Sequence, residues 1–173
     1  MAISFYEKDE LSSGFYGWRV VATIRGKRYQ KYISLNRRNT RVPQELWHKY
    51  QETKARYYEA RYAMRSAAIQ YLDFITKDHP NTRAYRGVGM HGITLGIGAD
   101  RGRASETCYF SVNKRGAATK FYIDDRTPLS KAWEQAVSYW GEVHEIRSKD
   151  VAKKLKLVPT PDQFKALRKQ LND

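Results

Sequence analysis

The most regular pattern in the chain is an alternation of apolar and polar residues on either side of one short turn. The alternation runs from Trp18 to Arg25 and again from Arg28 to Leu35, with Gly26-Lys27 between the two runs. A period of two predicts β-strands, and a two-residue Gly-X loop predicts a hairpin closed by a type II′ turn. We therefore expect an antiparallel hairpin with its tip at Gly26.

The hairpin has two chemically different faces, because neighbouring residues of a strand point to opposite sides of a sheet. One face is apolar and is expected to pack. The other carries arginine, amide and hydroxyl groups, which suit base edges and phosphates. In the predicted register the apolar face pairs Ile24 with Tyr29, Ala22 with Lys31, Val20 with Ile33 and Trp18 with Leu35, and the polar face pairs Arg25 with Arg28, Thr23 with Gln30, Val21 with Tyr32 and Arg19 with Ser34.

A short strand before the hairpin and a long helix after it complete the first half of the chain. The residues from Ala2 to Glu7 alternate as a strand does, and Pro43 stands where the first turn of a helix tolerates proline. No Gly or Pro follows until Pro80, so the helix is expected to run to about Lys77. Its apolar residues recur at intervals of three, four and seven and predict an amphipathic stripe: Leu46, Tyr50, Tyr57, Met64, Ala68, Leu72 and Ile75.

The same order of elements recurs about 90 positions later. Ile93, Leu95 and Ile97 alternate as a first strand, and a second hairpin is expected from Cys108–Lys114 and Ala118–Asp124 around Gly116-Ala117. At this offset Arg25-Gly26 falls on Arg115-Gly116, and Tyr32-Ile33 falls on Tyr122-Ile123. Thr127 is the expected cap of a helix that begins at Pro128 and runs to about Arg147, with Trp133 and Trp140 in the core.

These patterns predict an α+β fold made of two β-β-β-α modules, each a three-stranded antiparallel sheet packed on a helix, with a helical extension at the C-terminus. The expected domains are 1–77, a linker at 78–86, 87–147, and a basic extension at 148–173. In the extension, Thr160 and Gln163 form the capping box of a last helix through Leu171.

The composition narrows the functional class. The formal net charge is +14 at pH 7, which indicates nucleic acid or another polyanion as the partner. No apolar run reaches the roughly 20 residues that a membrane span needs, and the first residues do not have the layout of a signal peptide. Cys108 is the single cysteine, so an internal disulfide and a cysteine zinc cluster are excluded. We expect a cytoplasmic protein, associated with the nucleoid or present in a phage-infected cell.

The predicted DNA-binding residues lie on the polar faces of the two hairpins and in the neighbouring loops. Arginine can bind guanine through two hydrogen bonds, Asn and Gln can do the same with adenine, and hydroxyl groups or lysine bind phosphates. The set is Arg19, Thr23, Arg25, Arg28, Gln30 and Tyr32 in the first hairpin, Arg37 and Arg38 in the following loop, Arg101 and Arg103 in the turn of the second half, and Tyr109, Asn113, Arg115, Lys120 and Tyr122 in the second hairpin.

Three strands followed by a helix, with a basic sheet face, resemble the AP2/ERF-type DNA-binding domain. The segment from Gly17-Trp18-Arg19-Val20 through Gly26-Lys27-Arg28 is similar to that family's second and third strands, and to the arm-binding domain of phage tyrosine integrases. Ser130–Ala136 is similar to the helix start of bacterial and phage members. The resemblance implies that each sheet lies in the major groove and that Arg19, Arg25, Arg28, Tyr109, Arg115 and Lys120 contact bases. The first helix is much longer than the family's, and the second sheet is poorer in arginine.

Enzyme activity is not expected, because the four histidines are scattered and none has metal-ligand spacing. Neither a cofactor nor a metal is predicted. The expected function is sequence-specific binding of duplex DNA as a transcriptional regulator of bacterial, plasmid or phage origin. Two alternatives stay open: an RNA-binding protein, and a protein-binding inhibitor or adaptor from a mobile element. The long helix and the C-terminal extension are the candidate surfaces for a homodimer.

Overall fold

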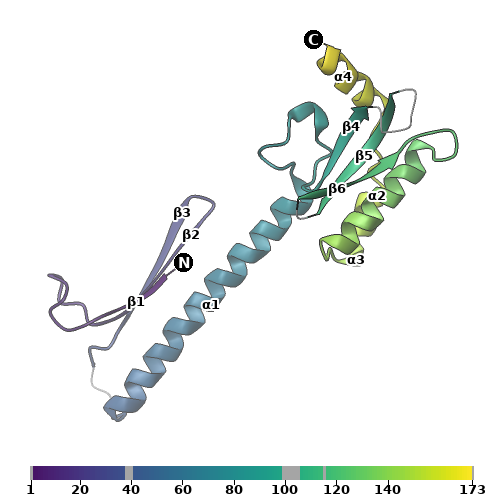
Figure 1. The fold of residues 1–173 in the computed structure, drawn as a ribbon. Coiled ribbons are helices and arrows are strands. Elements are labelled where there is room, and N and C mark those ends of the chain that lie inside the picture. The colour runs from purple at the N-terminus through teal and green to yellow at the C-terminus, as the bar shows by residue number, and fades with distance from the viewer. Residues whose placement is uncertain (1, 38–40, 99–105, 115, 173) are drawn as a thin grey trace. The chain divides into compact units, whose positions relative to one another are not determined.

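A computed structural model describes residues 2–37, 41–98, 106–114 and 116–172 (Figure 1). The chain divides into two compact units, Met1–Tyr71 and Leu72–Asp173. Each unit contains one three-stranded antiparallel sheet, and helices follow both sheets, so the predicted α+β class is confirmed. In the part of the chain that the structure describes, every helix is too short or too polar to cross a membrane.

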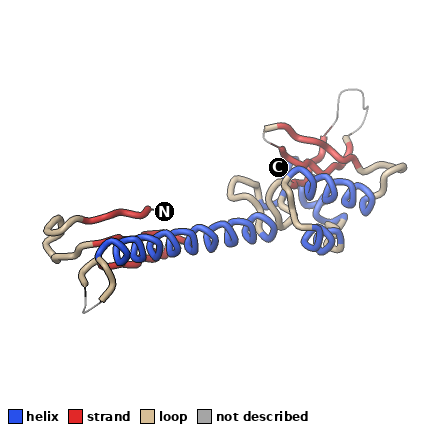
Figure 2. Tube along the Cα trace, turned by 90° about the horizontal axis from the view of Figure 1, so that it is seen from below, coloured by secondary structure: helices blue, strands red, loops and turns tan. Residues whose placement is uncertain are grey.

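The first unit contains the first sheet and most of the long helix. Its strands are β1 (Ala2–Tyr6), β2 (Gly17–Ile24) and β3 (Lys27–Ser34), in the spatial order β1-β2-β3, and the helix α1 spans Gln44–Thr76. The strands run beside the first part of this helix, as the red and blue segments of Figure 2 show. The helix begins after Pro43, whose carbonyl oxygen accepts a hydrogen bond from the Trp47 amide at 3.0 Å.

The tip of the first hairpin differs from the prediction. Ile24 pairs with Lys27, so the two turn residues are Arg25 and Gly26 instead of Gly26 and Lys27. Both have positive φ, 49° for Arg25 and 74° for Gly26, which is the geometry of a type I′ turn and not of the predicted type II′ turn. Each strand partner is therefore shifted by two positions. Because two is the side-chain period of a strand, the residues that remain in the strands keep their predicted faces, and Arg25 leaves the polar face for the turn.

The apolar face of the first sheet forms the core of the first unit. Trp18, Val20, Ile33 and Leu35 are buried there together with Ala55 of α1. The helix also contributes partly buried aromatic side chains to this cluster: Trp47, Tyr58 and Tyr62. Ala55 is fully buried in this cluster, whereas the larger aromatic side chains of the helix are only partly buried.

The predicted apolar stripe of α1 is not the face that packs. Leu46, Tyr50, Tyr57 and Met64 are 57%, 57%, 58% and 69% exposed. The helix instead contacts the sheet along Trp47, Gln51, Ala55, Tyr58 and Tyr62, which are also spaced by four and three residues. Further along the predicted stripe Leu72 is 47% exposed, and only Ile75 is buried. The helix therefore has two apolar stripes, and the sheet covers the one that the sequence pattern did not single out.

The second unit repeats the arrangement of strands. Its strands are β4 (Ile93–Gly98), β5 (Thr107–Lys114) and β6 (Ala117–Tyr122), in the order β4-β5-β6. β5 begins and ends 90 positions after β2, and the pair Lys114–Ala117 corresponds at the same offset to Ile24–Lys27. The predicted offset thus holds for both the bounds of the central strand and the register of the hairpin. A short 3₁₀ helix, η1 (Ala84–Arg86), precedes β4.

The core of the second unit lies between its sheet and the helix α2 (Leu129–Val143). Trp133 and Trp140 are 1% and 0% exposed, which confirms both as core residues. The Trp133 ring lies 5.0 Å from that of Phe110 in β5. Each indole N–H donates to a backbone carbonyl: Trp133 to Lys154 at 3.1 Å, and Trp140 to His91 at 2.8 Å.

The start and end of α2 differ from the prediction. Pro128, not Thr127, occupies the capping position. Thr127 instead forms a bridge with Asp124, whose carboxylate accepts its amide N–H at 2.9 Å. The helix ends at Val143 and not near Arg147, because Glu145 adopts a positive φ of 53° that a helix cannot contain.

Two helices form the C-terminal extension, α3 (Ser148–Leu155) and α4 (Pro161–Asn172). The Thr160 amide donates to Gln163 Oε1 at 2.9 Å, which is the backbone half of the predicted capping box. Phe164 and Leu167 of α4 are buried, and the Phe164 ring lies 5.6 Å from that of Phe110. The extension therefore packs within the second unit.

Candidate nucleic-acid interface

The polar face of the first sheet combines side chains from all three strands. The register places Ser4 of β1 opposite Arg19 of β2, and Arg19 opposite Tyr32 of β3. Because side chains alternate, these residues share one side of the sheet with the others two positions away. We call this surface the arginine face; it consists of Ser4, Tyr6, Arg19, Val21, Thr23, Arg28, Gln30 and Tyr32.

Arg19 is held in place at the centre of the arginine face. Its Nη2 atom donates to Gln30 Oε1 at 3.1 Å, and its Cζ atom lies 5.5 Å from the centre of the Tyr32 ring. A hydrogen bond to the Tyr6 hydroxyl is the main cause that raises the pKa of Arg19 above its ordinary value. The guanidinium is therefore charged and oriented by neighbours on both flanking strands, β1 and β3.

Arg28 and Thr23 lie at the turn end of the same face. They are directly opposite each other and both are exposed. Arg28 forms no hydrogen bond or ion pair with another described residue, so its five donors face solvent. The face thus contains one oriented arginine and one exposed arginine without a protein partner.

The loop residues of the predicted site are placed differently from the strand residues. Arg25 lies in the turn and not on β2, so it does not face Arg28 as predicted. Arg37 is exposed just beyond β3. Four further predicted residues, Arg38, Arg101, Arg103 and Arg115, lie outside the described residues.

The corresponding face of the second sheet is aromatic instead of arginine-rich. Tyr109 pairs with Tyr122, and their rings meet edge to face at 5.5 Å. The Lys120 ammonium lies 4.9 Å from the centre of the Tyr109 ring. A Cβ atom on Gly96 would collide with the Tyr109 ring, so the glycine leaves the space in which that ring lies across β4. Asn113 is exposed on the same face, opposite Ala118.

The first sheet also carries more positive charge than the second. The strands of the first sheet contain Arg19, Lys27, Arg28 and Lys31 and no acidic residue. The strands of the second sheet contain two lysines, Lys114 and Lys120, and no arginine. An anionic ligand is therefore attracted more strongly to the first sheet.

Tyr6 and Phe15 are functional candidates that the sequence pattern did not reveal. Tyr6 contacts Arg19, and the Phe15 ring lies 6.2 Å from Tyr6 and 5.2 Å from Tyr32, so that it supports both tyrosines. The alternation of β1 carried the signal for Tyr6, because Ser4 and Tyr6 alternate with Ile3 and Phe5. Phe15 lies outside any strand, and its position depends on the tertiary fold.

Comparison with protein families, curated proteins and solved structures finds no match to this chain, so its function is inferred from the chemistry of its surfaces.

Proposed function

We propose that the chain is a sequence-specific duplex DNA-binding protein and that the arginine face enters the major groove, as in the AP2-like domains that its hairpin resembles. The observation that carries the proposal is the oriented Arg19, a half-buried residue that donates to Gln30 and lies over Tyr32. Orienting a guanidinium before binding reduces the entropy lost when it contacts a base. The net charge of +14 supplies the attraction to the phosphate backbone.

The dimensions of a sheet suit this binding mode. Neighbouring strands lie about 4.8 Å apart, so β1 and β3 are roughly 10 Å apart, close to the ~12 Å width of the major groove. Side chains on one face recur about every 6.8 Å along a strand, which is close to two base-pair steps of about 3.4 Å. Gln30 and Arg28, two positions apart on β3, can therefore contact base pairs two steps apart.

The residues of the face have different roles in this proposal. Arg28 binds a guanine through its O6 and N7 atoms, the pairing for which a free guanidinium is best suited. Arg19 reads a second position from a fixed orientation, with Gln30 able to share an adjacent base. Arg25 at the turn and Arg37 after β3 contact phosphates and set the register along the duplex.

The second sheet favours a different contact. Two half-buried tyrosines and the exposed Lys120 form an aromatic surface of the kind on which unpaired bases stack. This observation supports the alternative of single-stranded DNA or RNA binding by the second unit. In the duplex proposal the same surface makes a weaker, less selective contact.

A binding experiment with four ligands tests the proposal. A random-sequence duplex library is selected with the full chain, and the enriched duplex is compared with a shuffled duplex, a duplex RNA and a single strand over a salt series. We expect the enriched duplex to bind at least about 1000-fold more tightly than the shuffled one, with a steep decrease of affinity with salt. Failure to enrich any sequence, or tightest binding to the single strand, would contradict the proposal.

A further inference from the structure

The exposed stripe of α1 has the spacing of a coiled-coil surface. Its residues alternate by four and three positions, the spacing of the a and d sites of a heptad repeat. All of them are exposed in the structure. We call this surface the helix seam; it consists of Leu46, Tyr50, Thr53, Tyr57, Ala60, Met64 and Ala67.

The seam is not the surface that the first sheet covers. The sheet packs on Trp47, Ala55 and Tyr58, which belong to the other apolar stripe of α1. Large side chains of the seam are left in water, with Tyr57 at 58% and Met64 at 69% exposure. A row of large apolar side chains along one helix face is more than the scattered exposure of an ordinary surface, and it marks an interaction site.

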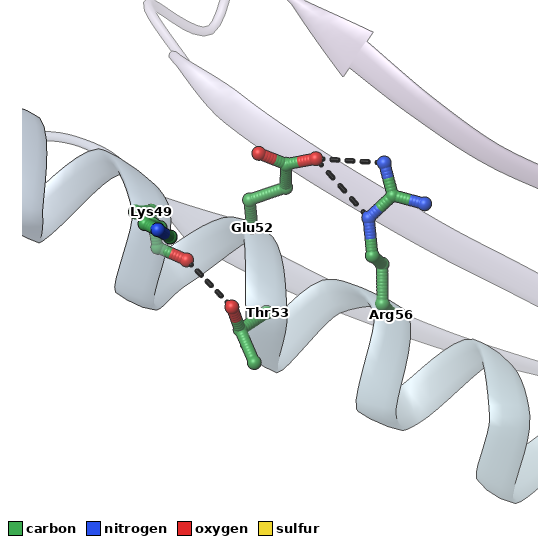
Figure 3. A network of polar contacts seen from close by, with 4 residues as sticks. All are labelled: Lys49, Glu52, Thr53 and Arg56. Atoms are coloured by element: carbon green, nitrogen blue, oxygen red, sulfur yellow. Dashed lines mark hydrogen bonds and ion pairs between the residues drawn. The ribbon is translucent and has the colours of Figure 1, made fainter.

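The hydroxyl group of Thr53, in the seam, already has a hydrogen-bond partner. The Thr53 hydroxyl donates to the Lys49 carbonyl oxygen at 2.8 Å, back along the same helix (Figure 3). Burying Thr53 under a partner helix would therefore leave no donor of its side chain unpaired. Apolar side chains of a partner can therefore cover the whole seam, from Leu46 to Ala67.

Four of the six positions that flank the seam are basic, two on each side; the other two are Trp47 and Ala63. Lys49 and Arg56 occupy g sites, and Lys54 and Arg61 occupy e sites. Glu52 pairs with Arg56 at 2.7 Å, as Figure 3 shows. Among the described residues, no ion pair reaches Lys49, Lys54 or Arg61. Charges at the e and g sites determine which partner a coiled-coil helix accepts.

These charges disfavour a second copy of the chain as the partner. In a parallel pair the g site of one helix faces the next e site of the other, so Lys49 would face Lys54 and Arg56 would face Arg61. In an antiparallel pair e sites face e sites, and Lys54 would lie beside Arg61. Both arrangements place like charges together.

We propose that the helix seam docks an amphipathic helix of a partner protein, with apolar residues at its own a and d sites and Asp or Glu at its e and g sites. The apolar seam supplies the packing surface, and the basic flanks select the acidic partner over a second copy. This inference does not depend on DNA binding, because the seam and the arginine face share no residue.

Synthetic helices provide the probe. One peptide of four heptads has Leu at every a and d site and Glu at every e and g site, so that its own charges keep it from pairing with itself; the second has Lys in place of Glu. Binding of each labelled peptide to the full chain is measured by fluorescence anisotropy. The variants are Tyr57→Ser with Met64→Ser, Lys54→Glu with Arg61→Glu, and the matched control Ser66→Ala, outside the seam; circular dichroism verifies the fold of each.

We expect the full chain to bind the acidic peptide and not the basic one. The Tyr57→Ser/Met64→Ser variant should bind at least about tenfold more weakly, and the control should bind unchanged. The Lys54→Glu/Arg61→Glu variant keeps basic g sites and should lose the preference for the acidic peptide. Binding of both peptides equally, or of neither, by the unsubstituted chain would overturn the proposal. Two other results would also overturn it, because each would assign the seam a different occupant. One is that the full chain sediments as a dimer and the Tyr57→Ser/Met64→Ser variant as a monomer. The other is that this variant loses affinity for DNA.

Discussion

Replacing Arg28 by alanine tests the arginine face most directly, because the same strand contains a matched control. Lys31 carries the same charge, lies three positions further along β3 and belongs to the opposite side of the sheet. Its ammonium lies 5.4 Å from the centre of the Tyr58 ring of α1. Arg28→Ala and Lys31→Ala therefore remove the same charge from two different faces.

The expected effects differ in size. An arginine that binds one guanine through two hydrogen bonds contributes about 1–3 kcal/mol, so Arg28→Ala should weaken binding to the enriched duplex by about 5- to 150-fold. Lys31→Ala should change the affinity by no more than about threefold, since only long-range attraction is lost. Both side chains are exposed, and each substitution should alter the free energy of unfolding by no more than about 0.5 kcal/mol.

The assay is fluorescence anisotropy with the enriched duplex and with singly substituted duplexes over a salt series. If Arg28 reads a base, Arg28→Lys should lose discrimination at one base pair, since an ammonium cannot reproduce the two-donor contact. If it binds a phosphate, affinity should fall uniformly and the salt slope should decrease by about 0.9. Equal losses for Arg28→Ala and Lys31→Ala would refute the assignment of binding to the arginine face.

Three further outcomes follow from the contacts of the structure. Gln30→Leu removes the hydrogen-bond acceptor of Arg19 and should weaken duplex binding by about 3- to 10-fold. In a chain that already carries Arg19→Ala, the same substitution should cause little further loss of affinity, because the two residues act together. Gly17→Ala would place a Cβ atom against a backbone carbonyl oxygen of β3, at a φ of 139°, and should lower the free energy of unfolding by about 2 kcal/mol or more. Gly14→Ala should lower it less, because no atom lies within 4 Å of the added Cβ. Equal losses for the two variants in denaturant titrations would contradict this prediction. Burial lowers the pKa of His144, so the neutral ring is favoured in the folded state. The free energy of unfolding should therefore decrease as pH falls below about 6.5. Denaturant titrations at about pH 7.5 and 5.5 should show a smaller decrease for His144→Gln than for the unsubstituted chain.

The hairpins show how far a local pattern reaches. The residues of each face follow from alternation alone, and they survive a register error because the shift was two positions. The predicted type II′ turn was wrong because Arg25 adopts a positive φ. Arginine rarely has this conformation, and the neighbouring residues do not predict it. Pairing between strands, and not the preference of one residue, determines that conformation.

The long helix shows where the pattern stops. Its sequence contains two apolar stripes, one through Tyr57 and Met64 and one through Trp47, Ala55 and Tyr58. Helical spacing identifies both equally well, but only one can face the sheet. The sheet covers the stripe that contains Ala55, and it leaves the seam in solvent.

The sequence by itself therefore determined the strands, the long helix, the repeat at an offset of 90 and the composition of each sheet face, because all of these are periodic features of neighbouring residues. The tertiary structure decided which helix face is covered, and that Tyr6, Gln30 and Tyr32 gather around Arg19. These features depend on contacts between residues far apart in the chain, and no local period contains them. The arginine face could be read from alternation, but the orientation of its central guanidinium required the fold.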